Sequence, residues 1–321
     1  MRALRSNRTR ALPGTILPTV TICVASFNTS AATELCVRSI MRLADQSYSL
    51  RIGDSGSTDG SLAMLEGFQK RGLLTLERSV EPRTHADWLD HWRRTCSSEF
   101  ILFVDSDVEF RRAGWLSRLM AIASSQHPAI AYAEWLPAGL FTLDGRQSPV
   151  VARPAPWLLL MDSEQTAELR SSFAVSYVPA TPDSSPPIIY DVGASLFYEA
   201  VGCGLRTVAL PRSYKRHFHH YGGLSWLPLS GPRGEKKARD QRTVKRRLRH
   251  LQRLQRHTSM TSHVIATAQL AALPQEVLDT LARIRRGLLR CCGRLAGRRT
   301  RGRGGRRTAG RFRHRPARRR R

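Results

Sequence analysis

The chain has 321 residues, 41% of them hydrophobic, which is enough to bury one large α/β core or two ordinary ones. Its net charge of +27 would suit a nucleic-acid-binding protein, but the charge is unevenly distributed. Residues 1–232 carry 23 Lys and Arg against 21 Asp and Glu (net +2), whereas residues 233–321 carry 29 against 4 (net +25). The composition therefore excludes a basic folded body and assigns the basicity to the C-terminal part.

The N-terminus begins with basic residues like a secretory signal, but the apolar stretch after them is short and rich in Thr and Val, like a strand. We therefore interpret residues 1–17 as a basic leader. The six cysteines show neither metal-ligand spacing nor a regular disulfide framework, which favours a reducing compartment. No run of 18 apolar residues occurs, so no membrane span is expected. These features predict a cytoplasmic protein.

The first 110 residues alternate between strand and helix patterns. Strands rich in β-branched residues are predicted at residues 19–27, 49–54, 73–78 and 99–107, and amphipathic or capped helices at 30–44, 56–72 and 84–96. Such alternation predicts an α/β fold with a mostly parallel, Rossmann-like sheet flanked by helices.

The second half of the body is less regular. A strand is predicted at 129–136, a Pro- and Ser-rich loop at 175–193, a helix at 193–204 and a strand at 206–211. We expect residues 18–110 and 111–232 to be two halves of one domain. Residues 233–297 are expected to form basic amphipathic helices, at 235–257 and 275–290. In residues 298–321, 13 of 24 positions are Arg, which predicts disorder.

Polar side chains follow three of the predicted strands, at Ser26 to Asn28, at Asp54 to Asp59 and at Asp105 to Asp107. In parallel sheets, ligands bind beyond the carboxyl ends of the strands, so these clusters should converge on one crevice.

Asp105 and Asp107 are one residue apart at the end of an apolar strand, so both carboxylates lie on the same side of the extended chain. Their mutual repulsion is relieved if a cation lies beside them, and oxygen ligands suit Mg²⁺ or Mn²⁺. The alternative is a polar turn with Asp105 as a cap and Asp107 solvated. Asp54 follows another strand and precedes a helix N-terminus, where a carboxylate can bind a base or ribose and the amides can bind phosphate. Asp59 is better explained as a helix cap.

Residues 19–110 resemble the nucleotide-sugar-binding half of a family 2 glycosyltransferase with the GT-A fold. The resemblance depends on "VTICVASFN", "IGDSGSTDGS" and "EFILFVDSDVEF", in the order and spacing of the family's motifs. It implies that Asp54 contacts the base, that Asp105 lies by the ribose and metal, and that Asp107 holds the metal on the diphosphate. The remaining nucleotide-sugar contacts are then expected from Ser26, Asn28, Ser57 and His85. "ASFN" departs from the family's Pro-Thr-Tyr-Asn, so the nucleotide stays open among UDP, dTDP and GDP.

The segment "YDVGASLFYEAVGCGLRTVALP" resembles the family's acceptor-side motif and places the catalytic base at Asp191. Tyr190 and Gly193 replace two acidic residues of that motif, and the alternative role for Asp191 is a helix N-cap. "HFHHYGG" resembles the family's His-X-Gly-Gly segment, which implies that His220 approaches the metal or diphosphate; a structural or merely exposed histidine is the alternative.

The resemblance implies a metal-dependent inverting transfer of a sugar from a nucleoside diphosphate to a hydroxyl acceptor: a sugar, a lipid-linked acceptor or a polysaccharide of the cell surface. The basic C-terminal part could hold the enzyme on an anionic membrane, at the inner face of the plasma membrane. Nucleic acid is not the expected partner. The alternative is that the protein is an anionic-surface or nucleic-acid-binding protein acting through its Arg-rich tail, or that the tail contributes nothing. The sequence predicts no oligomeric state.

Overall fold

The computed structural model describes residues 20–79, 81, 83–143, 146–178, 187–224 and 231–257, all of which belong to one compact unit. The leader at 1–17, the second basic helix at 275–290 and the Arg-rich segment 298–321 lie outside the described residues. Within the described residues, no helix combines the length and the apolar character needed to cross a membrane.

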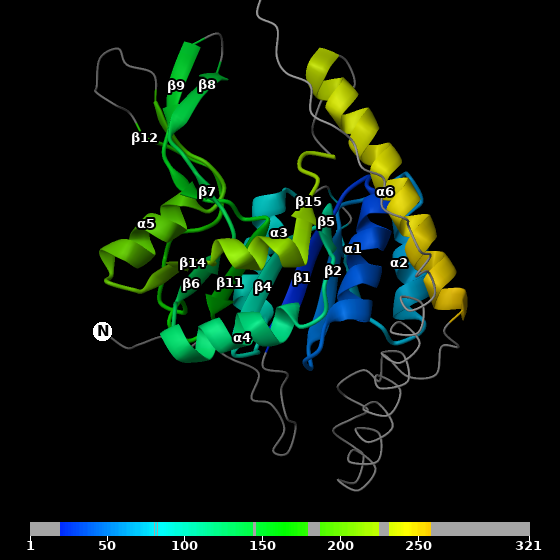
Figure 1. The fold of residues 1–321 in the computed structure, drawn as a ribbon. Helices are drawn as coiled ribbons and strands as arrows, with labels where there is room; N and C mark the ends of the chain where they lie inside the picture. Colours follow the sequence, from blue (N-terminus) through cyan, green and yellow to red (C-terminus); the bar gives the residue numbers. More distant parts are fainter. Residues whose placement is uncertain are drawn as a thin grey trace, which may run out of the picture. The chain divides into compact units, whose positions relative to one another are not determined.

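The centre of the unit is a seven-stranded sheet in the order β14-β6-β11-β4-β1-β2-β3 (Figure 1). Its strands are β1 (Val20–Ser26), β2 (Ser49–Asp54), β3 (Thr75–Arg78), β4 (Phe100–Asp105), β6 (Ile130–Tyr132), β11 (Leu158–Asp162) and β14 (Thr207–Ala209). All neighbouring pairs are parallel except those of β11, which runs antiparallel to both β4 and β6. The predicted α/β fold with a mostly parallel sheet is confirmed.

Helices cover both faces of this sheet, which explains why its strands are almost continuously apolar. On one face, Ile22 and Val24 of β1 pack with α1 (Ser30–Leu43), α2 (Ser61–Gln69) and α4 (Trp115–Gln126). On the other face, Cys23 packs with α3 (His85–Thr95) and α5 (Ala194–Gly202). Successive residues of β1 thus enter opposite cores, as the alternation of side chains along a strand requires.

Smaller elements lie beyond the carboxyl ends of the parallel strands. β5 (Val108–Phe110) pairs with β15 (Phe218–His220), which follows the short 3-10 helix η1 (Arg212–His217), and β7 (Trp135–Leu136) pairs with β10 (Arg153–Pro154). A separate sheet has the order β12-β13-β9-β8, with β8 (Gly139–Leu143), β9 (Arg146–Val150), β12 (Ser176–Val178) and β13 (Ile188–Tyr190). Both ends of the loop predicted at 175–193 are therefore strands, because the residues there are β-branched or aromatic and the prolines fall between them.

The helix α6 (Gly231–His257) is the first of the two predicted basic helices. Its apolar stripe of Val244, Leu248 and Leu251 packs against Ala32 and Leu35 of α1, and Figure 1 shows α6 running beside α1. These residues form a third buried cluster with Tyr221 and Leu224. The apolar stripe of this helix is buried against α1, so it is not available to enter a membrane.

Candidate active site

The three polar clusters predicted at strand ends meet at one edge of the sheet. In the parallel register Ser26 lies opposite Asp54, and Ala25 lies opposite Asp105. Hydrogen bonds then join the loops beyond the strands: Ser55 N donates to Ser26 O (3.0 Å), and Thr58 N donates to Asn28 Oδ1 (2.8 Å). The hydroxyls of Thr29 and Ser106 are 3.1 Å apart. The parallel topology therefore assembles the predicted crevice.

Asp105, Asp107 and His220 form a cluster in which one potential ligand atom from each residue lies within 4.8 Å of the others. We call these three residues the metal cluster, after the ion that they could hold. His220 Nε2 is 3.2 Å from Asp107 Oδ1 and 3.8 Å from Asp105 Oδ2. The buried oxygen Asp105 Oδ1 has His85 Nε2 3.2 Å away but accepts no hydrogen bond of good geometry from the described residues. Two carboxylates and an imidazole are ligands for Mn²⁺ or Mg²⁺. The residues present thus fit the expected divalent metal.

The charges of this cluster are strongly coupled. Burial alone would raise the pKa of Asp105, but His85 and His220 hold it below its ordinary value. Burial alone would lower the pKa of His220, but Asp107 and Asp105 raise it. The pKa of His85 is likewise raised by Asp105 against the effect of its burial. Two imidazoles therefore compensate the paired carboxylates, which is the electrostatic role that a bound cation can also fill.

Trp157 positions His220 and was not predicted from the sequence. Its ring stacks on the imidazole, with centroids 4.5 Å apart and planes at 21°. Trp157 is itself held because its Nε1 donates to Glu134 (2.9 Å) and its carbonyl accepts from Asp105 N (3.0 Å). The position of this ring depends on β11 running antiparallel beside β4, and no local motif signals that pairing.

The loop after His220 wraps around Asp107. Tyr221 N donates to Asp107 O (3.1 Å), and Leu224 N donates to Asp107 Oδ2 (3.2 Å). Between them, Gly222 and Gly223 adopt φ values of 72° and 74°. L-residues with side chains rarely adopt this left-handed conformation, so the glycine pair allows the chain to turn back onto the metal cluster.

Glu109 connects the metal cluster to α6 and was also missed at the sequence level. Its side chain is only 1% exposed, and Oε2 accepts from Tyr221 Oη (2.9 Å) and Arg111 Nε (3.0 Å). Oε1 accepts from Arg247 Nε of α6 (2.8 Å). Burial alone would raise the pKa of Glu109, but Arg247 and Arg111 lower it. In addition, Lys236 Nζ of α6 donates to Tyr221 O (2.8 Å). The helix α6 thereby holds the loop that follows His220.

Asp54 lies at the predicted nucleotide side of the crevice and is almost fully buried. Its Oδ2 accepts from the backbone N–H groups of Gly56 (3.1 Å) and Ser57 (2.9 Å), while Oδ1 is buried without a described donor. A carboxylate with one fixed and one free buried oxygen can accept a hydrogen bond from a ligand N–H or O–H.

The neighbouring predicted residues mostly shape the loops. Ser57 Oγ accepts from Asn28 N (3.0 Å), so these two residues join the ends of β1 and β2. The Ser26 hydroxyl is buried against the hydroxyl of Thr33 (3.1 Å), which leaves its backbone rather than its side chain near the crevice. Asp59 accepts from Ser30 N (2.8 Å) and Ser61 N (3.1 Å), at the first residues of α1 and α2, as a cap would.

His85 is the first residue of α3, after a capping box formed by Thr84 and Asp87. Its Nε2 lies 3.2 Å from Asp105 Oδ1, so the start of α3 reaches the metal cluster.

Asp191 lies at the end of β13, outside the metal cluster. Its Oδ2 forms an ion pair with Arg153 of β10, and its Oδ1 accepts from Val192 N (2.7 Å). The side chain is 38% exposed. Arg153 pairs with Leu136 of β7, which follows the carboxyl end of β6, so Asp191 lies on the same side of the main sheet as the cluster.

Residues 21–167 match the sequence profile described as glycosyl transferase family 2. This segment is similar to glycosyl transferase family 2, and the match covers a little under half of the chain. It contains the strands β1, β2 and β4 with Asp54, Asp105 and Asp107, whereas His220 and Asp191 lie beyond it. No curated protein matched the chain.

Solved structures of low sequence identity resemble this chain. Staphylococcus aureus TarS 1–349 with UDP-GlcNAc has a TM-score of 0.38 and 15% identity, over 48% of this chain and 48% of that one. The mannosyltransferase PcManGT from Pyrobaculum calidifontis with GDP-Man and Mn²⁺ has a TM-score of 0.43 and 16% identity, over 81% and 80%. Glucosyl-3-phosphoglycerate synthase from Mycobacterium tuberculosis, with Mn²⁺, UDP and glucosyl-3-phosphoglycerate, has a TM-score of 0.41 and 16% identity, over 73% and 80%. These TM-scores are below 0.5, so the assignment depends on the family match and on the geometry of the site.

Proposed function

We propose that the protein is a metal-dependent glycosyltransferase that moves a sugar from a nucleoside diphosphate to a hydroxyl acceptor. The observation that carries this proposal is the cluster of Asp105, Asp107 and His220 within 4.8 Å, at the carboxyl edge of a sheet most of whose strands lie in the segment similar to glycosyl transferase family 2. Asp54, with its free buried oxygen at the end of the neighbouring strand, supports a nucleoside site on the same edge.

Different residues of the chain would bind different parts of the donor. Asp54 would accept a hydrogen bond from the base of a UDP, dTDP or GDP sugar, and Asn28, Ser57 and His85 would shape its surroundings. Asp105, Asp107 and His220 would hold Mg²⁺ or Mn²⁺, which when bound neutralises the charge that develops on the leaving diphosphate. Trp157 and Glu109 would keep the imidazole and the following loop in place.

We assign the role of general base to Asp191, in a single displacement that inverts the anomeric carbon. The acceptor oxygen forms its bond to that carbon as the bond to the diphosphate oxygen breaks, and the acceptor proton passes to a carboxylate oxygen of Asp191. Arg153 forms an ion pair with this carboxylate and orients it in the resting protein. An acceptor hydroxyl must then displace part of that ion pair to reach the carboxylate.

A second candidate function, binding of polyanions without catalysis, is supported by the arginines on the outer side of α6. Arg242, Arg246 and Arg253 are exposed, and no carboxylate of the described part of the chain lies within 4.0 Å of them. This candidate gives no role to the buried carboxylates of the crevice, so we rank it second.

The decisive experiment is a screen of UDP, dTDP and GDP sugars for hydrolysis and transfer, with Mn²⁺ or Mg²⁺ and with a chelator. Asp107→Asn should abolish metal-dependent donor turnover while the protein stays folded, because the amide retains an oxygen for Leu224 N but loses the charge. Glu168→Gln, at an exposed glutamate, is the control. Normal turnover by the Asp107→Asn protein would refute the proposal.

Asp191→Asn tests the assignment of the base separately. This variant should bind the donor with unchanged affinity, measured by calorimetry with the nucleoside diphosphate and Mn²⁺, but lose transfer to the acceptor. If transfer persisted at the wild-type rate, another group would have to accept the proton.

A further inference from the structure

The separate sheet formed by β8, β9, β12 and β13 carries large apolar side chains that are exposed in the part of the chain that the structure describes. Leu140 and Phe141 of β8 are 69% and 56% exposed, and Tyr177 and Val178 of β12 are 53% and 45% exposed. These strands are the two outer strands of their sheet, at opposite edges. Four large apolar residues exposed on one small sheet exceed the single exposed residues that are normal on a protein surface, which indicates a partner.

The exposed residues occur as consecutive pairs, and this decides what kind of partner fits. Successive side chains of a strand point to opposite faces, so Leu140 and Phe141 project from different faces of the sheet, and so do Tyr177 and Val178. A docked protein or a second copy would cover one face and leave the other in water. A fluid apolar medium such as the interface of a lipid bilayer contacts both faces.

The backbone limits how deeply this sheet can enter a bilayer. The outer edges of β8 and β12 have no partner strand within the described sheet. Peptide groups without partners are too costly to place in the hydrocarbon region. The sheet therefore fits the headgroup region, where water remains available and where aromatic residues such as Phe141 and Tyr177 favour the boundary.

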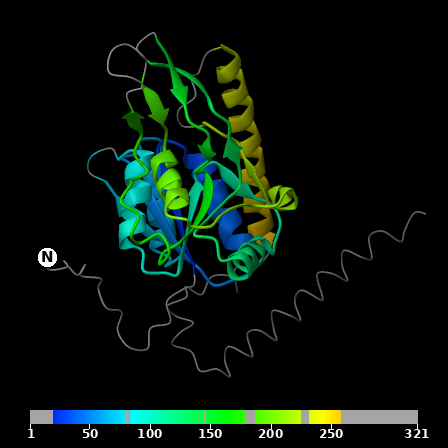
Figure 2. The same cartoon turned by 90° about the vertical axis from the view of Figure 1, so that its left-hand side faces the viewer.

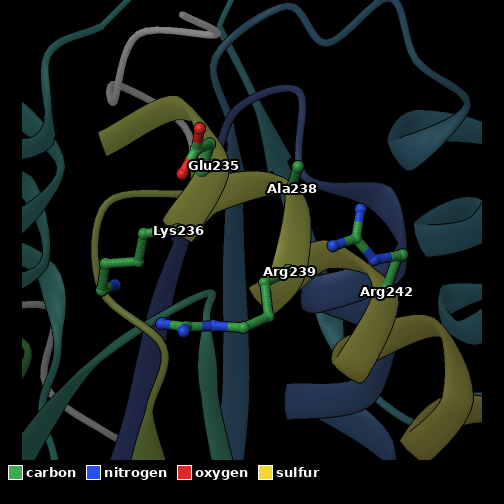
Figure 3. Close-up of a pocket in the computed structure, with 5 residues that line it drawn as sticks. All are labelled: Glu235, Lys236, Ala238, Arg239 and Arg242. Carbon is green, nitrogen blue, oxygen red and sulfur yellow. The ribbon is translucent and has the colours of Figure 1, made fainter. Parts of the chain in front are cut away.

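Basic side chains at the start of α6 lie near the loop that follows His220. Lys236, Arg239 and Arg242 line an open cavity of about 460 Å³ together with Glu235 and Ala238 (Figure 3). Arg239 is 71% exposed, and its one ion-pair partner among the described residues, Asp240, is 3.9 Å away. Arginine guanidinium groups that lack close partners are well suited to bind phosphate.

Arg239 and Arg242 belong to a row of arginines along α6, at alternating spacings of three and four residues. The row consists of Arg239, Arg242, Arg246, Arg249 and Arg253. The apolar residues Val244, Leu248 and Leu251 each follow an arginine of this row by two positions, which is about 200° around the helix. The face that packs on α1 and the arginine row are thus on opposite sides of α6, and the row faces outward over about 21 Å.

Both features lie on the carboxyl-edge side of the main sheet. β6 runs in the same direction as β4, since β11 is antiparallel to both, so the chain leaves β6 toward β8 at the edge that holds Asp105. Lys236 donates to Tyr221 O and Gly222 O, next to His220 at that same edge. Figure 2 shows the β8–β9 sheet and the start of α6 rising on one side of the main sheet.

We propose that this side of the protein binds an anionic membrane interface, with Leu140, Phe141, Tyr177 and Val178 in the headgroup region. Arg239 and Arg242 bind lipid phosphates in this arrangement. The acceptor in this arrangement is lipid-linked, an assignment that rests on the proposed function, because the membrane then presents headgroup hydroxyls to the sheet edge that holds Asp105.

The test measures sedimentation of the full chain with vesicles of phosphatidylcholine alone and of phosphatidylcholine with phosphatidylglycerol. The wild type should bind the anionic vesicles, and more weakly as salt is raised. Phe141→Ser should weaken binding about tenfold relative to its control Val201→Ser, an exposed apolar residue of α5. Arg242→Glu should weaken it about fivefold or more relative to Arg206→Glu, an exposed arginine beside the start of β14 at the opposite edge.

The rest of the basic C-terminal part can itself bind anionic vesicles, so hydrogen exchange provides a readout specific to this surface. Amides of residues 139–143 and 176–178 should exchange more slowly with vesicles present, while those of residues 198–202 should not change. Unchanged exchange there, or equal vesicle binding by Phe141→Ser and Val201→Ser, would overturn the proposal. So would duplex DNA binding that Arg242→Glu weakens while vesicle binding is unaffected, or a dimer in sedimentation velocity that Phe141→Ser dissociates.

This test can fail independently of the proposed function. Phe141→Ser and Arg242→Glu should keep the wild-type rate of metal-dependent donor hydrolysis in solution, because neither side chain contacts the metal cluster. If the wild type hydrolysed no donor but bound vesicles as described, membrane binding would stand, whereas the proposed function and the acceptor assignment that rests on it would be lost. If it hydrolysed donor but did not bind, the membrane proposal would be refuted alone.

Discussion

Replacing Arg247 by Met tests whether α6 belongs to the active site. Arg247 is the partner of Oε1 of Glu109, through Nε at 2.8 Å and Nη2 at 2.6 Å. Met retains an aliphatic side chain on the helix but has no hydrogen-bond donor. The substitution therefore leaves one oxygen of a carboxylate that is 1% exposed without a donor, while Arg111 and Tyr221 still serve the other oxygen.

The expected cost follows from this partial loss. A charged hydrogen bond contributes about 1.5–3 kcal/mol, and the larger cost of about 3–5 kcal/mol for a fully unpaired buried charge does not apply because Arg111 remains. For a domain of this size, each kcal/mol lowers Tm by about 2–4 °C, so we expect a decrease of about 3–12 °C. Binding of Mn²⁺ should also weaken, because Tyr221 links Glu109 to the candidate metal ligand Asp107. The Tyr221 hydroxyl donates to Glu109 Oε2, and the Tyr221 N–H donates to Asp107 O.

The assay is thermal unfolding by circular dichroism, with and without Mn²⁺, together with calorimetric titration of Mn²⁺. Arg246→Met is the matched control, since Arg246 is the preceding residue of the same helix, is exposed, and has no carboxylate within 4.0 Å among the described residues. If Arg247→Met and Arg246→Met had the same Tm and the same Mn²⁺ affinity, the link between α6 and the metal cluster would be refuted.

Two further predictions concern the other side of the crevice. Gly53→Ala should destabilise the protein by about 1–3 kcal/mol or more in urea unfolding, because a Cβ there would lie 2.5 Å from the buried ring of Trp88; Gly67→Ala, where nothing lies within 4 Å, is the control, and equal midpoints would contradict the packing argument. Glu77→Gln should change the dependence of stability on pH: burial alone would raise the pKa of Glu77, but Arg51, Trp92 and His91 hold it below its ordinary value. A carboxyl with a depressed pKa contributes stability above its ordinary pKa of about 4.3 and loses that contribution as pH falls through the folded-state pKa. The difference in unfolding free energy between wild type and Glu77→Gln should therefore be largest near neutral pH and shrink below about pH 4, and a difference independent of pH would show that the ion pair does not contribute.

Local sequence patterns were sufficient to predict the strands and the strand-end carboxylates of the candidate donor site. The apolar runs of β1 and β4 predict buried strands, and the helices between them predict a parallel sheet, as the structure confirms. From that arrangement alone, the polar residues after the strands must meet at one edge. The spacing of Asp105 and Asp107 within one segment likewise places two carboxylates together before any tertiary contact is known.

The residues that support this site could not be predicted in the same way. Glu109 and Arg247 are 138 positions apart, and their pairing depends on how α6 packs on α1. Neither the charge of Arg247 nor that of its neighbours distinguishes it from the other arginines of a basic helix. Trp157 reaches His220 only because β11 returns antiparallel beside β4, and Arg153 meets Asp191 across two strands of different sheets.

The sequence by itself determined the strands and helices of residues 19–107, the strand ends that carry carboxylates and the location of the positive charge, because each depends on spacing within one short segment. The tertiary structure alone decided that α6 holds the loop beside Asp105, Asp107 and His220, that its arginines face outward, and that an apolar sheet stands beyond the same edge of the main sheet. These features arise from contacts between segments far apart in the chain, whose geometry is set by the packing of helices and the pairing of strands rather than by any local pattern.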